Sequence, residues 1–195
     1  MTGLYAAAIA LGYALGSIPF GLLLTRIAGL GDIRSVGSGN IGATNVLRTG
    51  RKDIAALTLV LDGAKGAVAV LIMANWGEIP ALLAGFAAVA GHCTSPWVGF
   101  KGGKGVATAL GVTLAWSLNA GLLCLIAWLA AAALSKRSSV GSLTAMAAAP
   151  LLLWAFADGQ AALAGLAVST LSIARHHTNI ARLLDGTEPR IGAKR

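Results

Sequence analysis

The chain has 195 residues, of which 56% are hydrophobic and only 11% are charged, and its formal net charge is +8. Soluble domains carry about 25% charged residues, so this composition argues against a soluble protein and predicts one membrane-embedded domain over residues 1–195. The basic residues sit in short clusters between apolar runs, which is the positive-inside pattern and argues against nucleic-acid binding. Cys93 and Cys124 lack metal-type spacing, so we expect free thiols and neither a metal nor a redox cofactor.

Seven apolar segments are expected to cross the membrane as helices. The first, 2–25, is uncharged and exceeds the roughly 20 residues that a crossing needs, and a basic, glycine-rich loop follows it to Lys52. The run 106–134 is too long for one crossing, and we divide it at the polar stretch 117–121. The other expected spans are 54–76, 79–98, 140–157 and 159–174, with a polar tail over 175–195.

The loop charges predict the orientation of these spans. If the loop 26–52 is cytoplasmic, every loop Lys and Arg falls on the cytoplasmic side. A single crossing over 106–134 would move Lys136 and Arg137 to the outside and spoil this pattern. The sequence therefore predicts an all-α integral membrane protein with seven transmembrane helices, the N-terminus outside and the C-terminus cytoplasmic.

The first of three unusual polar segments on the predicted cytoplasmic side is 37–48. It contains a formal G-x-G-x-x-G, but a dinucleotide site needs a strand before the glycines, and here a membrane span precedes them. What remains is a loop that can present N–H groups beside hydrogen-bonding side chains, with Arg48 as a partner for phosphate or carboxylate. A flexible basic loop is the alternative interpretation.

The second segment contains Lys101-Gly102-Gly103-Lys104-Gly105. Glycines allow positive φ and close approach of N–H groups to a ligand, and successive N–H groups before a helix can form an anion-binding nest. Lysine adds a mobile point charge. The pattern is no Walker A loop; it predicts a phosphate cradle, unless the lysines merely flank a span.

The third segment begins at Arg175. If the last span continues as a helix, Arg175, Asn179 and Arg182 share a face, with His176 beside Asn179. A merely interfacial histidine is the alternative. Within the second span, Asp62 and Lys65 are costly charges, and their spacing favours a structural ion pair near the site over a catalytic role.

Together the three segments resemble the bacterial membrane glycerol-3-phosphate acyltransferases that use acyl phosphate as donor. The resemblance covers nearly the whole chain, including the early stretch 16–19. The matching positions are 37–40, Asn45, Arg48, Gly91, His92, 100–105, Arg175, His176, Asn179, Ile180, Arg182, Gly186 and Glu188.

This resemblance implies a seven-span enzyme of the bacterial cytoplasmic (inner) membrane with its site at the cytoplasmic face. The reaction would transfer a fatty acyl group from acyl phosphate to the 1-hydroxyl of glycerol 3-phosphate, giving lysophosphatidic acid and phosphate, the opening step of phospholipid synthesis. The implied central residues are Ser38, Arg48, Lys104, His176 and Asn179. The implied substrate-binding residues are Gly37, Gly39, Asn40, Asn45, His92, Lys101, Gly102, Gly103, Gly105, Arg175, Arg182 and Glu188.

The implied chemistry suits these residue types. Acyl phosphate is a mixed anhydride with a good leaving group, so no covalent enzyme intermediate is needed. Lys104 and Arg48 would neutralise phosphate charge, and Ser38 and Asn179 would orient the reacting groups. The base would be His176 or a substrate phosphate; we favour the substrate, because the motifs show no carboxylate–histidine pairing.

A transporter or carrier of a phosphorylated solute is the alternative from another functional class. Such proteins carry inverted repeats and polar groups at mid-membrane on several helices. The sequence shows no such repeat, and only Asp62 and Lys65 lie within a predicted span.

Overall fold

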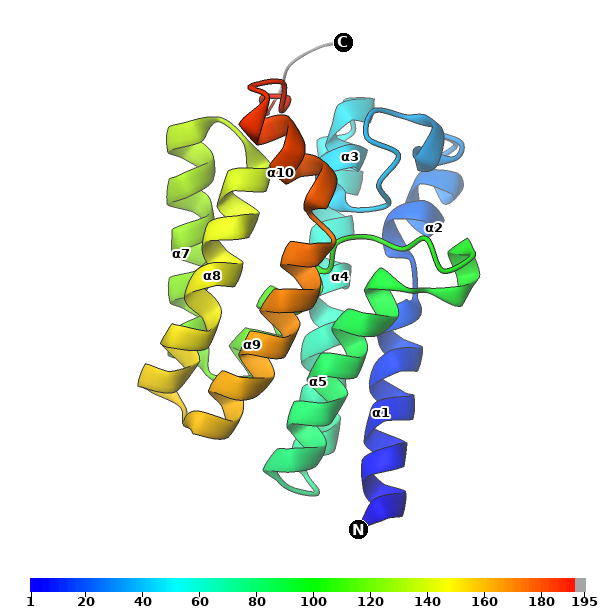
Figure 1. The fold of residues 1–195 in the computed structure, drawn as a ribbon. Coiled ribbons are helices and arrows are strands. Elements are labelled where there is room, and N and C mark those ends of the chain that lie inside the picture. The colour runs from blue at the N-terminus through cyan, green and yellow to red at the C-terminus, as the bar shows by residue number, and fades with distance from the viewer. Residues whose placement is uncertain (192–195) are drawn as a thin grey trace.

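The computed structural model describes residues 1–191 and contains helices but no strand within that range. The helices that form the body of the molecule lie side by side in one bundle (Figure 1). They are α1 (Thr2–Ser17), α2 (Phe20–Ile27), α4 (Lys52–Ala74), α5 (Glu78–Cys93), α6 (Val106–Trp116), α7 (Leu118–Ser135), α8 (Ser138–Phe156) and α9 (Gly159–Ala174). The short helices α3 (Ala43–Val46) and α10 (His177–Leu184) lie at one end of the bundle, and single 3₁₀ turns occur at Ile33–Ser35, Leu47–Thr49 and Pro96–Val98.

The helical membrane character predicted from the sequence is confirmed. Among the described residues, five segments are long and apolar enough to span a membrane: Thr2–Ile27, Lys52–Ala74, Glu78–Val98, Leu118–Ser135 and Ser138–Phe156. The helices α6 and α9 are apolar but shorter, with 11 and 16 residues. The count of seven spans and their orientation therefore stay predictions.

The predicted division of the run 106–134 is also confirmed. Helix α6 ends at Trp116 and α7 begins at Leu118. Between them, the Ser117 hydroxyl accepts a hydrogen bond from the Ala120 N–H at 3.4 Å, which caps the start of α7. A polar residue that can cap a helix thus ends one apolar segment and begins the next.

Three predicted boundaries differ from the structure. The first span is interrupted between Ser17 and Phe20, because Pro19 has no N–H to continue the helical hydrogen bonds. Helix α5 ends at Cys93, ahead of a turn that contains Pro96. The last span does not continue as one helix, since the chain turns at 175–176 before α10. Residues 192–195 of the predicted tail and domain lie outside the described residues.

Small residues bring the helices into close contact. Helix α1 lies beside α5 (Figure 1), and a Cβ atom added at Gly12 or Gly16 would come within 2.2 or 2.0 Å of the carbonyl oxygens of Ala84 and Ala88. In a membrane, where water does not drive helices together, such backbone contacts supply much of the packing energy. Cys93 and Cys124 are free and buried in this packing, as predicted.

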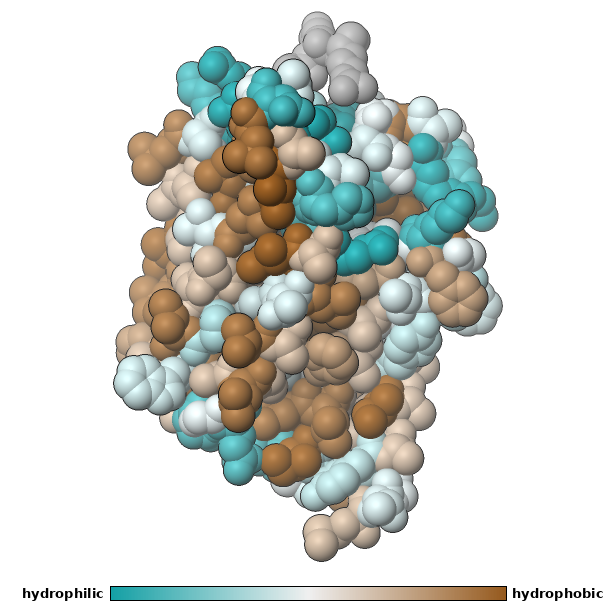
Figure 2. All heavy atoms as spheres, in the orientation of Figure 1, coloured by the Kyte–Doolittle hydropathy of each residue, from teal (hydrophilic) through white to brown (hydrophobic). Residues whose placement is uncertain are grey.

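The bundle is polar at one end. Hydrophilic side chains gather at the end that carries α10 and the loop around α3, whereas apolar side chains cover most of the sides (Figure 2). The three unusual polar segments lie at this end, as the alternating direction of the helices predicts (Figure 1). The fold therefore collects them above an apolar body.

The contact between α1 and α5 gives a first testable prediction. Gly16→Ala should lower the free energy of unfolding by about 1–3 kcal/mol, because the new methyl group overpacks the interface with Ala88. Gly3→Ala on the same helix is the matched control, since a Cβ atom there meets no atom within 4 Å. Thermal unfolding of both variants in detergent measures the difference. Equal melting temperatures would contradict this account of the interface.

Candidate functional site

The first polar segment is organised by the buried side chain of Asn45. Its amide nitrogen donates to three loop carbonyl oxygens at 2.8–3.0 Å, those of Ile33, Val36 and Asn40. Its amide oxygen accepts from the Ser38 N–H at 3.0 Å, from the Ser38 hydroxyl at 3.3 Å and from Arg48 Nη1 at 3.4 Å. Asn45 therefore holds the loop in shape and connects the two predicted central residues of this segment.

Two glycines permit this shape. Gly37 and Gly39 have φ angles of +56° and +70°, which residues with a Cβ atom rarely adopt. A Cβ atom at Gly37 would also lie 2.6 Å from Asn45 Oδ1 and 2.7 Å from Arg48. Ser38 and Arg48 are both exposed, so the segment presents a hydroxyl and a guanidinium group at the polar end. The Asn40 side chain accepts from the Gly42 N–H at 3.0 Å, within the same loop.

The glycine–lysine loop, residues 101–105, lies directly on the end of α5. The Gly103 N–H donates to the His92 carbonyl oxygen at 3.1 Å, and a Cβ atom at Gly102 would fall 2.1 Å from the same oxygen. Of its three glycines, Gly105 alone has a positive φ, +81°, immediately before α6. Gly102 and Gly103 thus permit close backbone contact rather than positive φ. The Gly103 N–H is used within the protein, which corrects the expected nest at that position.

The end of α9 holds the same loop from another side. Arg175 donates to the carbonyl oxygens of Gly102 and Gly103 at 3.1 and 3.3 Å, and the Ser172 hydroxyl donates to the Lys104 carbonyl oxygen at 2.8 Å. Arg175 therefore holds the backbone of the loop, a contact that the sequence analysis did not anticipate. Ser172 was missed by the sequence analysis, although it lies one helical turn before His176.

A chain of polar contacts joins the Lys104 side chain to the third segment. Lys104 Nζ donates to Asn179 Oδ1, and Asn179 Nδ2 donates to Glu188 Oε1 at 2.7 Å. Arg182 donates to the other Glu188 oxygen at 2.7 Å. Arg137, which the sequence analysis did not include in the site, donates to the Glu188 carbonyl oxygen at 3.2 Å. These contacts fix the orientation of the Asn179 amide, and the Lys104 ammonium group points toward its oxygen.

The electrostatics of Lys104 show that the three segments meet. The pKa of Lys104 is lowered from its ordinary value to about 8, chiefly by burial; Glu188 opposes this shift, and the charges of Arg182, Arg48 and Arg175 add to it. Each segment contributes at least one of these groups. The arrangement is a partly buried ammonium group surrounded by guanidinium groups, and an anionic ligand is the natural complement of such a site.

His176 is buried at the turn between α9 and α10, whereas His177 is exposed. His176 Nδ1 lies 2.7 Å from the Ser172 carbonyl oxygen, which can only accept, so Nδ1 carries the proton. Burial lowers the pKa of His176, and the positive charge of Lys104 acts in the same direction. The neutral ring therefore keeps Nε2 as its accepting nitrogen.

Other predicted residues lie around this centre. Lys101 is exposed at the start of the loop, whereas His92 is buried beneath it. The predicted ion pair is present, with Lys65 Nζ 2.7 Å from Asp62 Oδ1. His92 Nδ1 lies 3.0 Å from the same Lys65 nitrogen, a contact that the sequence analysis did not anticipate, because α4 and α5 carry these residues far apart in sequence.

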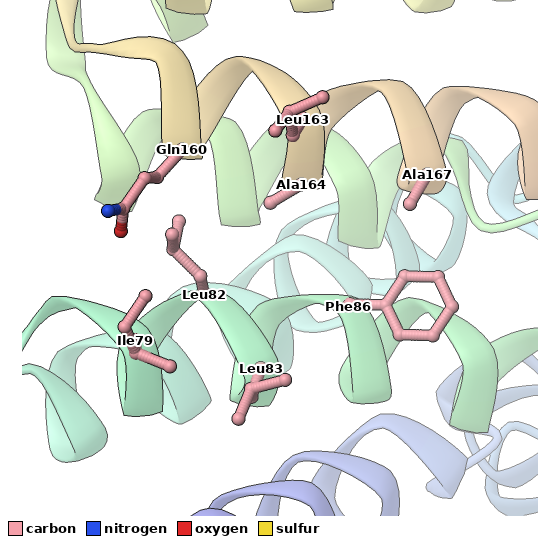
Figure 3. Close-up of a pocket in the computed structure, with 8 residues that line it drawn as sticks. All are labelled: Ile79, Leu82, Leu83, Phe86, Gln160, Leu163, Ala164 and Ala167. Atoms are coloured by element: carbon pink, nitrogen blue, oxygen red, sulfur yellow. The ribbon is translucent and has the colours of Figure 1, made fainter.

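An apolar groove of about 320 Å³ opens between α5 and α9. Ile79, Leu82 and Phe86 line it from α5, and Leu163, Ala164 and Ala167 from α9, with one polar side chain, Gln160, at the start of α9 (Figure 3). Phe86 and Ala167 each lie seven residues, or about 10 Å of helix, before their helices end at the polar site. The groove has the lining that a hydrocarbon chain requires.

Comparison with known proteins places this arrangement in a family. The model of the glycerol-3-phosphate acyltransferase family matches residues 6–186. The glycerol-3-phosphate acyltransferase of Paramagnetospirillum magneticum is 55% identical over 185 residues, covering 94% of this chain and 92% of the relative. That of Methylorubrum extorquens is 55% identical over 188 residues, covering 96% and 93%.

Two solved structures are similar throughout. The glycerol 3-phosphate form of the integral membrane glycerol 3-phosphate acyltransferase PlsY is 38% identical, with a TM-score of 0.91 and 96% of each chain covered. Its lysophosphatidic acid form is 36% identical, with a TM-score of 0.89 and coverage of 96% of this chain and 95% of that one. With its three polar segments joined around Lys104, this chain belongs to the glycerol-3-phosphate acyltransferase family.

Proposed function

We propose that this protein transfers a fatty acyl group from acyl phosphate to the 1-hydroxyl of glycerol 3-phosphate at the cytoplasmic face of a bacterial inner membrane. The convergence of Lys104 with Arg48, Arg175 and Arg182 carries the proposal, because both substrates bring a phosphate group. Relatives that match nearly the whole chain are named glycerol-3-phosphate acyltransferases, and the solved forms with glycerol 3-phosphate and lysophosphatidic acid fit the proposed substrate and product.

The proposed reaction needs positioning and charge neutralisation more than covalent help. The 1-hydroxyl oxygen attacks the acyl carbon, the bond from that carbon to the phosphate oxygen breaks, and inorganic phosphate leaves. Lys104 and Arg48 stabilise the negative charge of the phosphates and of the transition state. Ser38 and Asn179 orient the reacting groups, each held by the hydrogen bonds described above.

The proton of the attacking hydroxyl goes to a substrate phosphate in this proposal. A histidine base is usually oriented by a third group, often a carboxylate. In residues 1–191 no carboxylate forms an ion pair with His176. Its Nδ1–H is instead directed to the Ser172 carbonyl oxygen. In this proposal the uncharged His176 ring lies near Lys104 and takes no part in the proton transfer.

The acyl chain would lie between the helices, as small residues there allow. The groove between α5 and α9 offers apolar surface below the polar site (Figure 3). Because the donor has a phosphate at one end and hydrocarbon behind it, a polar site above an apolar groove matches both parts of the molecule.

The donor is tested first. Purified protein receives labelled glycerol 3-phosphate with either palmitoyl phosphate or palmitoyl-CoA, and lysophosphatidic acid is expected from the acyl phosphate alone. A Lys104→Gln variant purified in parallel should form little product, which excludes a contaminating enzyme. Product from the thioester alone would keep the acyltransferase class and overturn the donor. No product from folded wild-type protein would favour a carrier of phosphorylated solutes.

The base is tested with His176→Ala, and His177→Ala is the matched exposed control. We expect kcat of His176→Ala to stay within about tenfold of wild type, because a substrate phosphate accepts the proton. General bases contribute about 10²–10⁴-fold. A loss of that size in His176→Ala, with the protein folded and His177→Ala unaffected, would assign the proton transfer to His176 instead.

The pH dependence tests the charge of Lys104. Its pKa of about 8 belongs to the unliganded enzyme, and kcat/KM reports that state. Because the protonated amine binds phosphate, kcat/KM for glycerol 3-phosphate should fall as pH rises through about 8. Lys104→Arg, which stays charged, should remove this fall even if its activity is lower, and Lys52→Gln on the exposed start of α4 should keep it. Identical profiles for wild type and Lys104→Arg would contradict the assignment.

A further inference from the structure

A neutral cluster of charged and polar groups is buried beneath the site. Lys65 and Asp62 on α4 have side chains only 2% and 3% exposed, and the His92 ring at the end of α5 lies against them. The Lys65 ammonium group has three N–H donors. They reach Asp62 Oδ1 at 2.7 Å, the Ile18 carbonyl oxygen at 2.7 Å and His92 Nδ1 at 3.0 Å.

This bonding pattern determines which way the His92 ring faces. The Lys65 ammonium group can only donate, and it lies nearer to His92 Nδ1, at 3.0 Å, than Asp62 Oδ1 does, at 3.7 Å. His92 Nδ1 therefore accepts, and Nε2 of the neutral ring carries the proton. Nε2 faces the glycine–lysine loop, since a Cβ atom at Gly103 would lie only 2.1 Å from it. The Gly103 N–H also donates to the His92 carbonyl oxygen. His92 thus contacts Gly103 through both its ring and its backbone, one residue before Lys104.

The same ammonium group also reaches the other side of the site. Ile18 lies in the interruption between α1 and α2. On α2, Gly21 packs against the backbone of the first polar segment, because a Cβ atom there would fall 1.8 Å from the Ile41 carbonyl oxygen. Lys65 therefore contacts Ile18, just before the helix that packs against the loop of Ser38 and Arg48. Through His92 it also contacts the loop that carries Lys104.

We propose that Asp62, Lys65 and His92 form a positioning cluster that sets the placement of the Lys104 loop relative to the Arg48 loop, and with it the affinity for the phosphate of glycerol 3-phosphate. This inference rests on the proposed function, and it gives His92 a role in placing the loop rather than the substrate contact expected from the family resemblance. A buried charged pair is costly to retain in a membrane. In this protein the Lys65 ammonium group holds three backbone elements in a defined geometry: α4, the turn at Ile18 and the end of α5.

Two substitutions of His92 separate its functions. His92→Phe keeps the ring volume but removes the acceptor for Lys65, whereas His92→Asn can keep an acceptor near Nδ1 but removes the ring beyond it. We expect His92→Phe to raise KM for glycerol 3-phosphate, with KM for acyl phosphate unchanged. Because misplacement of about 1 Å can cost about 10²-fold, kcat/KM should fall by about 10- to 100-fold.

Gly103 supplies the rescue experiment. Gly103→Ala should abolish most activity, because its methyl group collides with His92 Nε2. Adding His92→Asn removes that atom, so the double variant should be at least about tenfold more active than Gly103→Ala alone, a coupling expected only between groups in contact. Thr113→Val is the control for loss of a buried polar group away from the cluster, because the Thr113 hydroxyl donates within α6, to the Ala109 carbonyl oxygen. Its kinetic constants should match wild type.

Hydrogen exchange tests the cluster without relying on turnover. The Gly103 N–H donates to the backbone carbonyl of His92, which His92→Phe keeps. Losing the ring contact to Lys65 should loosen the end of α5 and with it this bond, so a peptide covering 99–105 should exchange faster in His92→Phe and at the wild-type rate in Thr113→Val. Unchanged exchange and unchanged KM in His92→Phe, or additive losses in the double variant, would overturn the positioning role. Wild-type protein that exchanges as described but forms no product would instead contradict the proposed function.

Discussion

The site depends on one ammonium group that is kept partly out of water. Lys104 is drawn toward Asn179, whose orientation is set by Glu188, which in turn is paired with Arg182. Because burial and neighbouring guanidinium groups disfavour its charge, the pKa of Lys104 lies near 8. An incoming phosphate reverses that balance, since it neutralises several positive groups at once. The protein thus holds its cations in an arrangement that a bound anion makes more favourable.

The apolar bundle supports this arrangement through backbone contact. Gly102 and Gly103 lie against the end of α5, and Gly12 and Gly16 hold α1 against the same helix. Close packing of backbones leaves little freedom for the loop that carries Lys104, which is what a reaction based on positioning requires. The glycines of the loop and the glycines of the membrane helices therefore both restrict the movement of the loop that carries Lys104.

Much of this could be predicted from the sequence, and the parts that could not have a common cause. Apolar lengths and loop charges predicted the helices and the division at Ser117, and charged residues from the first and third segments, Arg48, Arg175, Arg182 and Glu188, do act on Lys104 in the second. The contact of His92 with Lys65 and the role of Ser172 were not predicted, because they join elements far apart in sequence. The Gly103 N–H is not available to the expected nest for a related reason: it donates to a tertiary partner, the His92 carbonyl oxygen, that no local pattern reveals.

The location of charge within the bundle favours an enzyme over a carrier. A carrier needs polar groups at mid-membrane that exchange partners as the site opens to either side. The charges inside the bundle, Asp62 and Lys65, are already paired, and each donor of Lys65 has an acceptor in the protein. A group of cations, Arg48, Arg175 and Arg182, lies instead at one end of the bundle, around Lys104. A phosphate group can enter there from water while an attached acyl chain stays among the helices. Glycerol 3-phosphate and acyl phosphate can then react without either one crossing the membrane.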